Sequence, residues 1–303
     1  MKRRQQHDLC GLLNINKSPD MSSRQALNAI ERLIGRGVKV GHAGTLDPIA
    51  TGVLVVCLGK ATRLVPYIQE HPKVYRAEFL TGLFSPTDDI EVESTPVPDA
   101  YPFSAEELVA VLPEFVGVID QVPPAFSAVK VDGHRAYDLA RKGIDVDIAS
   151  KRIEIGKIDL LNFSHDRFSI EIQCGSGTYV RALGRDIARK LGSSAVMSKL
   201  ERTAIGPFRV DNALTVEELS REQIVSEMLP LQTAVPHLPT CTLNAAEIAI
   251  LRCGRRVIPE SGLLDPTPQR ISILDESSQL IAIGEVQLNG YVAPRQLLIA
   301  AQQ

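Results

Sequence analysis

Three side chains capable of chemistry lie close together in the segment GHAGTLDPIATG, which begins at Gly41. His42, Thr45 and Asp47 stand among glycines, directly ahead of the apolar run VLVVCL. Polar groups on a loop that enters a buried strand are often functional, and an aspartate there can act as a nucleophile or a general base. An ordinary turn, in which Asp47 bonds its own backbone ahead of Pro48, explains the same pattern. On the pattern alone, the turn is the favoured interpretation.

A row of arginines in GSGTYVRALGRDIARKLG is a second candidate. Arg181, Arg185 and Arg189 are spaced four residues apart, so a helix would carry them on one side and its apolar residues on the other. Charges at this spacing usually form a solvated helix face. Arg181 differs because it lies in the first turn, just after a glycine-rich bend, from which its side chain can reach a neighbouring loop.

Cysteine spacing and missing motifs exclude several kinds of site. The five cysteines are scattered and never spaced as C-x-x-C, which disfavours a disulfide framework and a structural zinc site. We expect free thiols, with Cys57 and Cys174 as small core residues. The motifs of P-loop proteins, α/β-hydrolases, zincins and dinucleotide-binding folds are absent, since GSGTYV lacks both the P-loop lysine and a third glycine.

Size and charge set wider limits. A chain of 303 residues with 44% hydrophobic residues can bury the core of one large domain and a small one. The net charge of −3 speaks mildly against nucleic acid as a partner, but acidic residues gather at 87–93 and 216–222, so basic clusters can exist elsewhere. No apolar run approaches the ~20 residues of a membrane span, and MKRRQQH lacks the apolar stretch of a secretory signal, so we expect a cytoplasmic protein without a membrane partner.

Periodicity and caps predict the elements around GHAGTLDPIATG. The segment SSRQALNAIERLIGRG has a serine cap, apolar residues at helical spacing and a glycine stop, which predicts a helix over residues 22–37. The run VLVVCL is typical of a buried strand, and a short helix is expected from Ala61 to Gln69. In KVYRAEFLTG, Tyr75, Ala77 and Phe79 alternate as in a half-buried strand, so Tyr75 should point inward.

The middle of the chain mixes strands and helices. Residues 81–101 are acidic and rich in proline, which predicts a mobile loop, and SAEELVAVLPEF then carries the S-x-x-E capping box of a helix. AFSAVKV, RIEIGKIDLL and FSIEIQC are predicted strands. Because this order lacks the regular βαβ rhythm of a doubly wound fold, we expect an α+β fold.

The last 60 or so residues change character after three prolines, Pro230, Pro236 and Pro239, which mark a linker. A helix start at Asn244, strand-like runs and a basic cluster of Arg252, Arg255 and Arg256 follow. We therefore predict two domains, residues 1–238 and 239–303, of which the second is small and β-rich.

Five separated segments resemble one protein family. GHAGTLDPIATGVLVVCLGKATRL is similar to the signature of the TruB family of pseudouridine synthases, approximately G-H-x-G-x-L-D-P-x-A-x-G-x-L-x-x-x-x-G-x-A-T. The same order continues with KVYRAEF, PPAFSAVKVDGHRAYDLARKG, CGSGTYVRALGRDIARKLG and LERTAIGPF. The resemblance covers most of residues 10–212 and implies a catalytic domain with a mixed, largely antiparallel sheet flanked by helices and loops. The small C-terminal domain resembles the PUA-like module that assists tRNA binding in this family.

The resemblance implies an isomerase that converts uridine-55 in the T-loop of tRNA to pseudouridine, with Asp47 as the catalytic carboxylate. The implied reaction requires no metal and no cofactor, because the uracil is only detached, turned and rejoined through carbon 5. Whether Asp47 attacks the ribose, adds to the ring or removes a ribose proton stays open. The residues that match the family's uridine pocket are His42, Tyr75, Tyr179, Arg181 and Leu200.

Recognition would require the target base to leave the T-loop stack, with His42 filling the space behind it and Tyr75 stacking on the uracil or taking the carbon-5 proton. Arg181 paired with Asp47 would hold the carboxylate. Basic residues at 32–39, 181–189 and 252–256 are candidate phosphate contacts. The ordinary alternatives are a satisfied loop histidine for His42 and simple packing for Tyr75.

Two segments depart from the family pattern. This chain has NKSPDMSS where the family has D-K-P-x-G-x-[ST]-S, and SPTDDIEVES where the family has T-D-T-x-D-x-x-G. The backbone geometry of these two loops is therefore left open by the resemblance. Two other functions are considered: a tRNA-binding protein whose catalysis is lost, and a member of the guide-RNA-dependent branch. The intact Asp47, Tyr75 and Arg181 favour an enzyme, and the compact chain without long basic tails favours a stand-alone monomer that needs no guide RNA.

Overall fold

The computed structural model describes residues 9–127, 129–131, 133–144, 146–260, 264–265 and 267–298, and within these ranges ten strands form the main sheet. Its order is β14-β1-β3-β12-β4-β11-β10-β7, with β13 beside β12 and β2 beside β3. Among these described strands, β1–β14 and β12–β3 pair in parallel and the other neighbours are antiparallel. The α+β fold with a mixed, largely antiparallel sheet is confirmed. The strands are β1 (Gly11–Lys17), β2 (Val40–His42), β3 (Thr51–Leu58), β4 (Lys73–Thr81), β7 (Gly117–Gln121), β10 (Lys151–Ser164), β11 (Arg167–Cys174), β12 (Ala195–Ile205), β13 (Phe208–Arg209) and β14 (Leu214–Thr215).

Helices begin where the sequence places their caps. Ser22, Ser104 and Asn244 each accept a hydrogen bond from a backbone N–H three residues later, and a side chain at that position closes the capping box. The predicted short helix after β3 is a 3₁₀ turn, η2 (Gly59–Leu64), that continues into α2. The α-helices are α1 (Ser23–Ile34), α2 (Val65–Glu70), α3 (Ala105–Val111), α4 (Ala136–Ala140), α5 (Val180–Lys190), α6 (Arg221–Ser226) and α7 (Ala245–Arg252).

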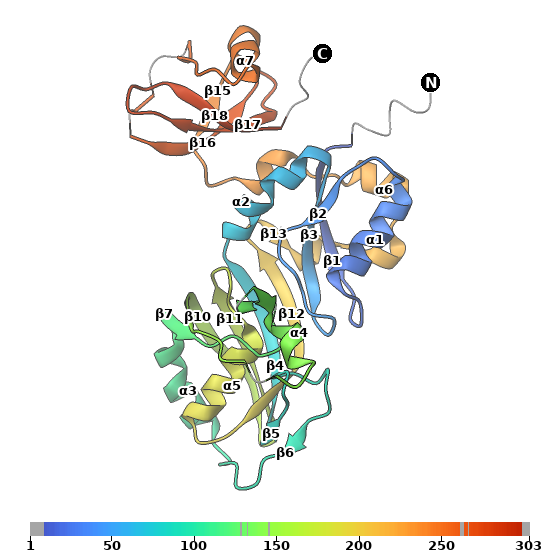
Figure 1. Ribbon diagram of the computed structural model, residues 1–303, viewed down its shortest axis with the longest axis vertical. Coiled ribbons are helices and arrows are strands. Elements are labelled where there is room, and N and C mark those ends of the chain that lie inside the picture. Colours follow the sequence, from blue (N-terminus) through green and yellow to red (C-terminus); the bar gives the residue numbers. More distant parts are fainter. Residues whose placement is uncertain are drawn as a thin grey trace.

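Separate helices cover different parts of the sheet. Figure 1 shows α1 and α6 beside β1 and β3, whereas α5 lies against β4, β10 and β11. The contact between α5 and β4 is so close that a Cβ atom at Gly184 would lie 1.9 Å from Cε1 of Phe79. The close packing of α5 on β4 therefore requires glycine at position 184, in the interior of the helix. Phe79 in turn stacks on Phe168 of β11, with ring centroids 5.1 Å apart.

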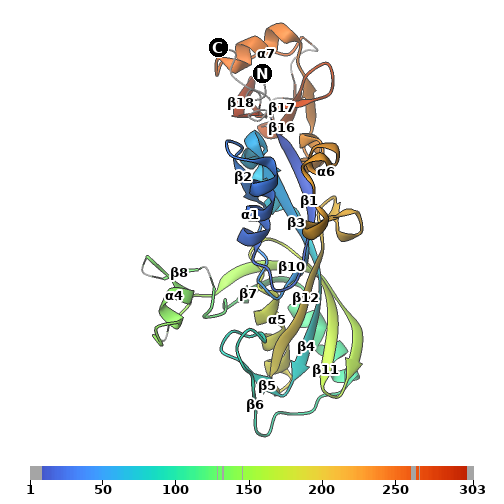
Figure 2. The same ribbon diagram turned by 90° about the vertical axis from the view of Figure 1, so that its right-hand side faces the viewer.

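The acidic segment 81–101 is more ordered than a mobile loop. It contains a small antiparallel pair, β5 (Leu83–Phe84) with β6 (Thr95–Pro96), and buries Thr87, Asp88 and Asp89. The segment is therefore not a structureless excursion: Asp88 and Asp89 are turned into the protein, whereas Glu91, Glu93 and Asp99 are exposed. The strand predicted for AFSAVKV is also much shorter than expected: β8 (Lys130–Val131) pairs with β9 (His134–Arg135), and this hairpin with α4 projects from one side in Figure 2.

The C-terminal residues form their own sheet, whose described strands follow the order β15 (Thr240–Thr242), β16 (Gln269–Leu274), β17 (Leu280–Val286) and β18 (Val292–Leu297). It lies at one end of the molecule in Figure 1 and packs against the remainder of the chain. Ile283 shares an apolar cluster with Leu64 and Leu238, and Arg270 makes two 2.8 Å contacts with Glu70 on α2. The small sheet is thus held by apolar and ionic contacts as well as by the covalent chain.

The cysteines behave as predicted: they are free, and Cys57 and Cys174 are buried. None of the helices among the described residues has the length and apolar character that a membrane span requires.

Candidate active site

Asp47 lies on the loop between β2 and β3, and the loop is fixed on both sides of it. Ser23, at the start of α1, accepts a hydrogen bond from the Leu46 N–H (2.8 Å) and donates one to the Leu46 carbonyl (3.0 Å). Lys17, at the end of β1, donates to the Pro48 carbonyl at 3.1 Å. The Asp47 side chain remains 37% exposed, so a carboxylate on a rigid loop is open to solvent.

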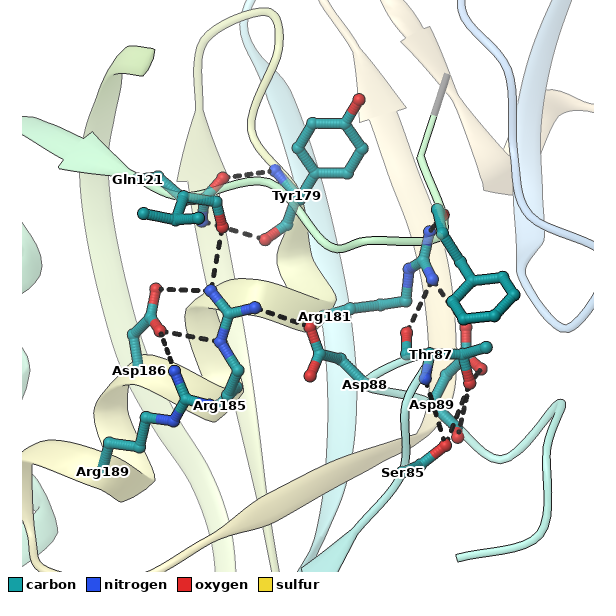
Figure 3. A network of polar contacts seen from close by, with 12 residues as sticks. Ser85, Thr87, Asp88, Asp89, Gln121, Tyr179, Arg181, Arg185, Asp186 and Arg189 are labelled. Atoms are coloured by element: carbon teal, nitrogen blue, oxygen red, sulfur yellow. Dashed lines mark hydrogen bonds and ion pairs between the residues drawn. The ribbon is translucent and has the colours of Figure 1, made fainter. Parts of the chain in front are cut away.

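Arg181 joins this loop to the acidic segment. Its Nε atom lies 3.1 Å from Oδ2 of Asp47, and Nη1 lies 3.1 Å from Oδ2 of Asp89. The same guanidinium donates to the carbonyls of Thr87 (2.7 Å) and Phe126 (3.2 Å). The Arg181 side chain is only 8% exposed and that of Asp89 1%. Arg181 is therefore a buried bridge between an accessible carboxylate and an inaccessible one. Figure 3 shows Arg181 beside Thr87 and Asp89 of the acidic segment.

The row of arginines on α5 is mostly not a solvated face. Arg185 contacts Asp88 at 2.8 Å and Asp186 at 2.9 Å, and it donates to the Val122 carbonyl. Of the three, only Arg189 is largely exposed, at 63%. The expectation that the row 181–189 contacts phosphates is not supported for Arg181 and Arg185, whose donors are already engaged by protein acceptors. The sequence could not show this because Asp88 and Asp89 lie about a hundred residues earlier in the chain than the arginines they contact.

Asp89 is fixed in place by its own hydrogen bonds. Its Oδ1 atom accepts from the Thr87 hydroxyl (2.6 Å) and the Glu91 N–H (3.1 Å), while Oδ2 faces Arg181. Glu91 lies near both aspartates: burial raises the pKa of its carboxyl, and the negative charges of Asp89 and Asp47 raise it further. The site thus concentrates carboxyl groups around one guanidinium.

The strand order β3-β12-β4 explains how distant residues meet. β12 lies between β3, which Asp47 precedes, and β4, which carries Tyr75. In register, Leu200 of β12 opposes Ala77, and Arg202 opposes Tyr75. Gly52 is required at the crossing with β3, because it has a φ of +95° and a Cβ there would lie 2.3 Å from the Arg202 carbonyl oxygen.

The remaining predicted pocket residues come from the surrounding elements. Tyr75 is half-buried, and its burial raises the pKa of the phenol, whereas Leu200 is buried in the same apolar cluster. Tyr179 precedes α5, and its backbone exchanges two hydrogen bonds with the Gln121 side chain, at 2.9 and 3.0 Å. His42 ends β2, and burial together with the charge of Arg202 lowers the pKa of its ring, which favours the neutral form.

Sequence profiles for two parts of one family match this chain. The profile described as TruB family pseudouridylate synthase (N terminal domain) matches residues 32–180, and that described as tRNA pseudouridylate synthase B C-terminal domain matches residues 181–235. The chain belongs to the TruB family. This confirms the resemblance that its motifs carried, and it identifies the isomerisation of uridine to pseudouridine as the chemistry of the family to which this chain belongs.

Curated relatives of this TruB-family chain are named tRNA pseudouridine synthase B. The protein from Bradyrhizobium diazoefficiens is 36% identical over 97% of this chain and 87% of its own length. That from Brucella ovis is 38% identical over 94% of this chain and 86% of its own length. A solved Cbf5–Nop10–Gar1 complex contains a chain with the same fold, with a TM-score of 0.72 at 24% identity over 98% of this chain and 87% of that one.

Three polar residues of this TruB-family site were not predicted as site residues. Arg202, Asp89 and Lys17 are buried around the loop of Asp47. Lys17 lies in NKSPDMSS and Asp89 in SPTDDIEVES, the two segments that depart from the family pattern. The segment SKLERTAI also contains Lys199 and Glu201, so Arg202 carries no signal in the sequence that distinguishes it from an exposed strand residue.

Proposed function

We propose that this enzyme converts uridine-55 in the T-loop of tRNA to pseudouridine, with Asp47 as its catalytic carboxylate. The observation that carries the proposal is the position of Asp47: a part-exposed carboxylate on a rigid loop, held by a buried arginine. The names of the curated relatives support tRNA as the substrate.

The reaction needs a carboxylate at the ribose or the ring, a group that removes the carbon-5 proton and a pocket that retains the detached uracil. Asp47 supplies the first, as a nucleophile toward the sugar or ring or as a base toward a ribose proton. Tyr75 is placed to stack on the uracil and to receive the carbon-5 proton. Leu200 and Tyr179 line the pocket, and Arg181 holds the carboxylate in one orientation.

The target base must leave its stack to reach Asp47, since a base within a folded RNA loop is inaccessible. We propose that His42 fills the space that the flipped base leaves in the stack. Its neutral ring suits insertion between stacked bases, because the lowered pKa keeps a charge from being desolvated there.

Residues 1–238 are proposed as the catalytic domain and 239–303 as a PUA-like module that binds RNA. The separate four-stranded sheet with α7 supports this division, and Arg255 and Arg256 supply positive charge on its surface. We also propose that the enzyme acts as a cytoplasmic monomer without a guide RNA; of these three properties, the tRNA-specific names of its relatives favour only the last.

A tritium-release assay on the purified chain tests this function. The substrate is an unmodified tRNA transcript whose uracils carry tritium at carbon 5, and the control is the same transcript with cytidine at position 55. We expect release from the first and none above background from the second. Failure on bare tRNA, with activity only after a guide RNA is added, would reject the stand-alone function.

A further inference from the structure

A second arginine, besides Arg181, reaches the loop of Asp47. Arg202 on β12 is only 2% exposed and is among the largest fully buried side chains of the described chain. Its Nε donates to the Val53 carbonyl at 2.8 Å and its Nη2 to the Gly44 carbonyl at 3.0 Å. Nη1 lies 3.5 Å from the hydroxyl of Tyr75. One guanidinium therefore connects the loop of Asp47 to the tyrosine of the pocket.

The charge of Arg202 is not balanced in the way buried charges usually are. Among the residues that the structure describes, no carboxylate forms an ion pair with it, although its donors reach backbone carbonyls. Buried ions are normally paired, because removal from water is costly. Arg181, by contrast, has two carboxylates within 3.1 Å.

Other cationic groups lie around the same point. Burial, with the positive charge of Arg202 as a smaller cause, lowers the pKa values of Lys17 and Lys73 to about 8. Asp20 and Asp47 oppose this effect at Lys17, as Cys174 does at Lys73. Beside Tyr75, Arg202 is thus a buried positive charge that has no carboxylate in an ion pair among the described residues, which favours a negative group next to the tyrosine.

Such a group arises in the reaction proposed above, on which this inference rests. When the bond between uracil N1 and the ribose breaks, the bonding electron pair stays with the uracil, which becomes an anion. The pair is used again when carbon 5 bonds to the ribose, and the carbon-5 proton then departs while N1 regains a proton, so the product is an isomer. Between these steps the anion needs a positive environment that is already in place.

We propose that Arg202 is a positioning residue that orients the Tyr75 hydroxyl and provides the positive charge against which the detached uracil is held. The register of β4 with β12 sets Tyr75 and Arg202 directly opposite each other, so the geometry is built into the sheet. The guanidinium also lowers the pKa of Tyr75, against the effect of burial, and so assists the phenol as a proton carrier.

A purely structural role is the alternative, because Arg202 also ties Gly44 to Val53. Arg202→Lys keeps the charge, Arg202→Gln keeps hydrogen-bond donors without the charge, and Arg202→Met keeps only the stem. We expect the saturating single-turnover rate on tRNA to fall roughly 100-fold for Gln and Met and about tenfold for Lys, with tRNA affinity unchanged. Equal rates for Lys and Gln, or weaker tRNA binding with an unchanged rate, would overturn the proposal.

Combination with Tyr75→Phe tests the link between the two residues. In that background, Arg202→Gln should cost less than it does alone, because the part of its effect that acts through the Tyr75 hydroxyl is already gone, whereas the loss of positive charge beside the uracil remains. Full multiplication of the two losses would contradict a role through Tyr75.

A spectroscopic measurement keeps the inference separate from the proposed function. We would label the protein with 3-fluorotyrosine, assign Tyr75 by its loss in Tyr75→Phe, and follow its fluorine resonance with pH. We expect ionisation at higher pH in Arg202→Gln than in the wild type, and close to the wild type in Arg202→Lys. An unchanged titration rejects the inference even in an active enzyme, whereas a wild-type chain inactive on tRNA rejects the proposed function alone.

Discussion

Nε of Arg181 lies 3.1 Å from Oδ2 of Asp47, while Nη1 of the same guanidinium lies 3.1 Å from Oδ2 of Asp89. The two contacts use different nitrogens of one planar group, so the orientation of the buried Asp89 is transmitted to the accessible Asp47. An arginine can hold two partners in fixed directions, whereas a lysine offers a single point charge.

This geometry predicts the effect of two substitutions of Arg181. If the residue only neutralised Asp47, Arg181→Lys would preserve much of the rate. Because it positions the carboxylate, we expect Arg181→Lys and Arg181→Met to lose on the order of 100-fold in single-turnover rate, with tRNA binding changed only slightly. A nearly wild-type lysine variant would reject positioning, and a defect in tRNA binding alone would make Arg181 a phosphate contact.

Asp47→Asn should abolish isomerisation and leave tRNA affinity nearly unchanged. The amide keeps the shape of the carboxylate but serves neither as a charged nucleophile nor as a base. Tritium release and filter binding measure the two quantities on the same preparation. Turnover near the wild-type rate would remove Asp47 from the catalytic role.

The sequence predicted local features of the site better than the contacts between its distant segments. The helix cap at Ser22, the strand with Tyr75 facing inward and the reach of Arg181 from the first turn of α5 all follow from spacing and caps, and the structure contains each of them. The family motifs supplied the candidate roles, and the roles of His42, Tyr179 and Leu200 in binding stay predictions.

Contacts between distant segments escaped prediction. Arg202 reaches Val53 and Gly44 only because β12 inserts between β3 and β4, and an arginine in a strand pattern ordinarily predicts an exposed position. The acidic segment looked mobile for the same reason. Its buried Asp89 is balanced by Arg181, which lies ninety-two residues later in the chain.

Asp89→Asn is expected to destabilise the fold and to slow the reaction. Removal of one partner from a buried ion pair leaves an uncompensated charge, so we expect a loss of about 3 kcal/mol in the free energy of unfolding. Urea denaturation measures this loss. The control Asp166→Asn, which breaks an exposed pair with Arg167, should stay close to the wild type. Equal stability of the Asp89 and Asp166 variants would show that Asp89 does not carry the network.

The C-terminal module is better tested by point substitutions than by deletion. Removal of residues 239–303 would expose the apolar surface around Leu64 and Leu238, so a deleted chain would report on folding as well as on binding. Replacement of Arg255 and Arg256 by alanine should weaken binding of full tRNA and lower the slope of log K against log salt by about 2, with the saturating rate unchanged. If the affinity for full tRNA and the salt slope stayed unchanged, the module would have a purpose other than tRNA binding through these arginines.

Lys17 predicts a pH dependence of stability. Burial lowers the pKa of this lysine from 10.5 to about 8 in the folded protein. Below pH 8 it is protonated in both the folded and the unfolded state, and above about 10.5 it is neutral in both, so its contribution changes only between these values.

Within that window the unfolded chain binds the extra proton, and therefore stability from Lys17 rises with pH and is lost as the pH falls toward 8. The free energy of unfolding of the wild type relative to Lys17→Met should increase between pH 8 and pH 9.5 by on the order of 1 kcal/mol per pH unit. Urea denaturation at several pH values measures this, and Lys39→Met, at an exposed lysine, is the control for the loss of one charge. A difference between the wild type and Lys17→Met that is constant, or that shrinks as the pH rises, would show that the folded protein does not hold Lys17 with a lowered pKa.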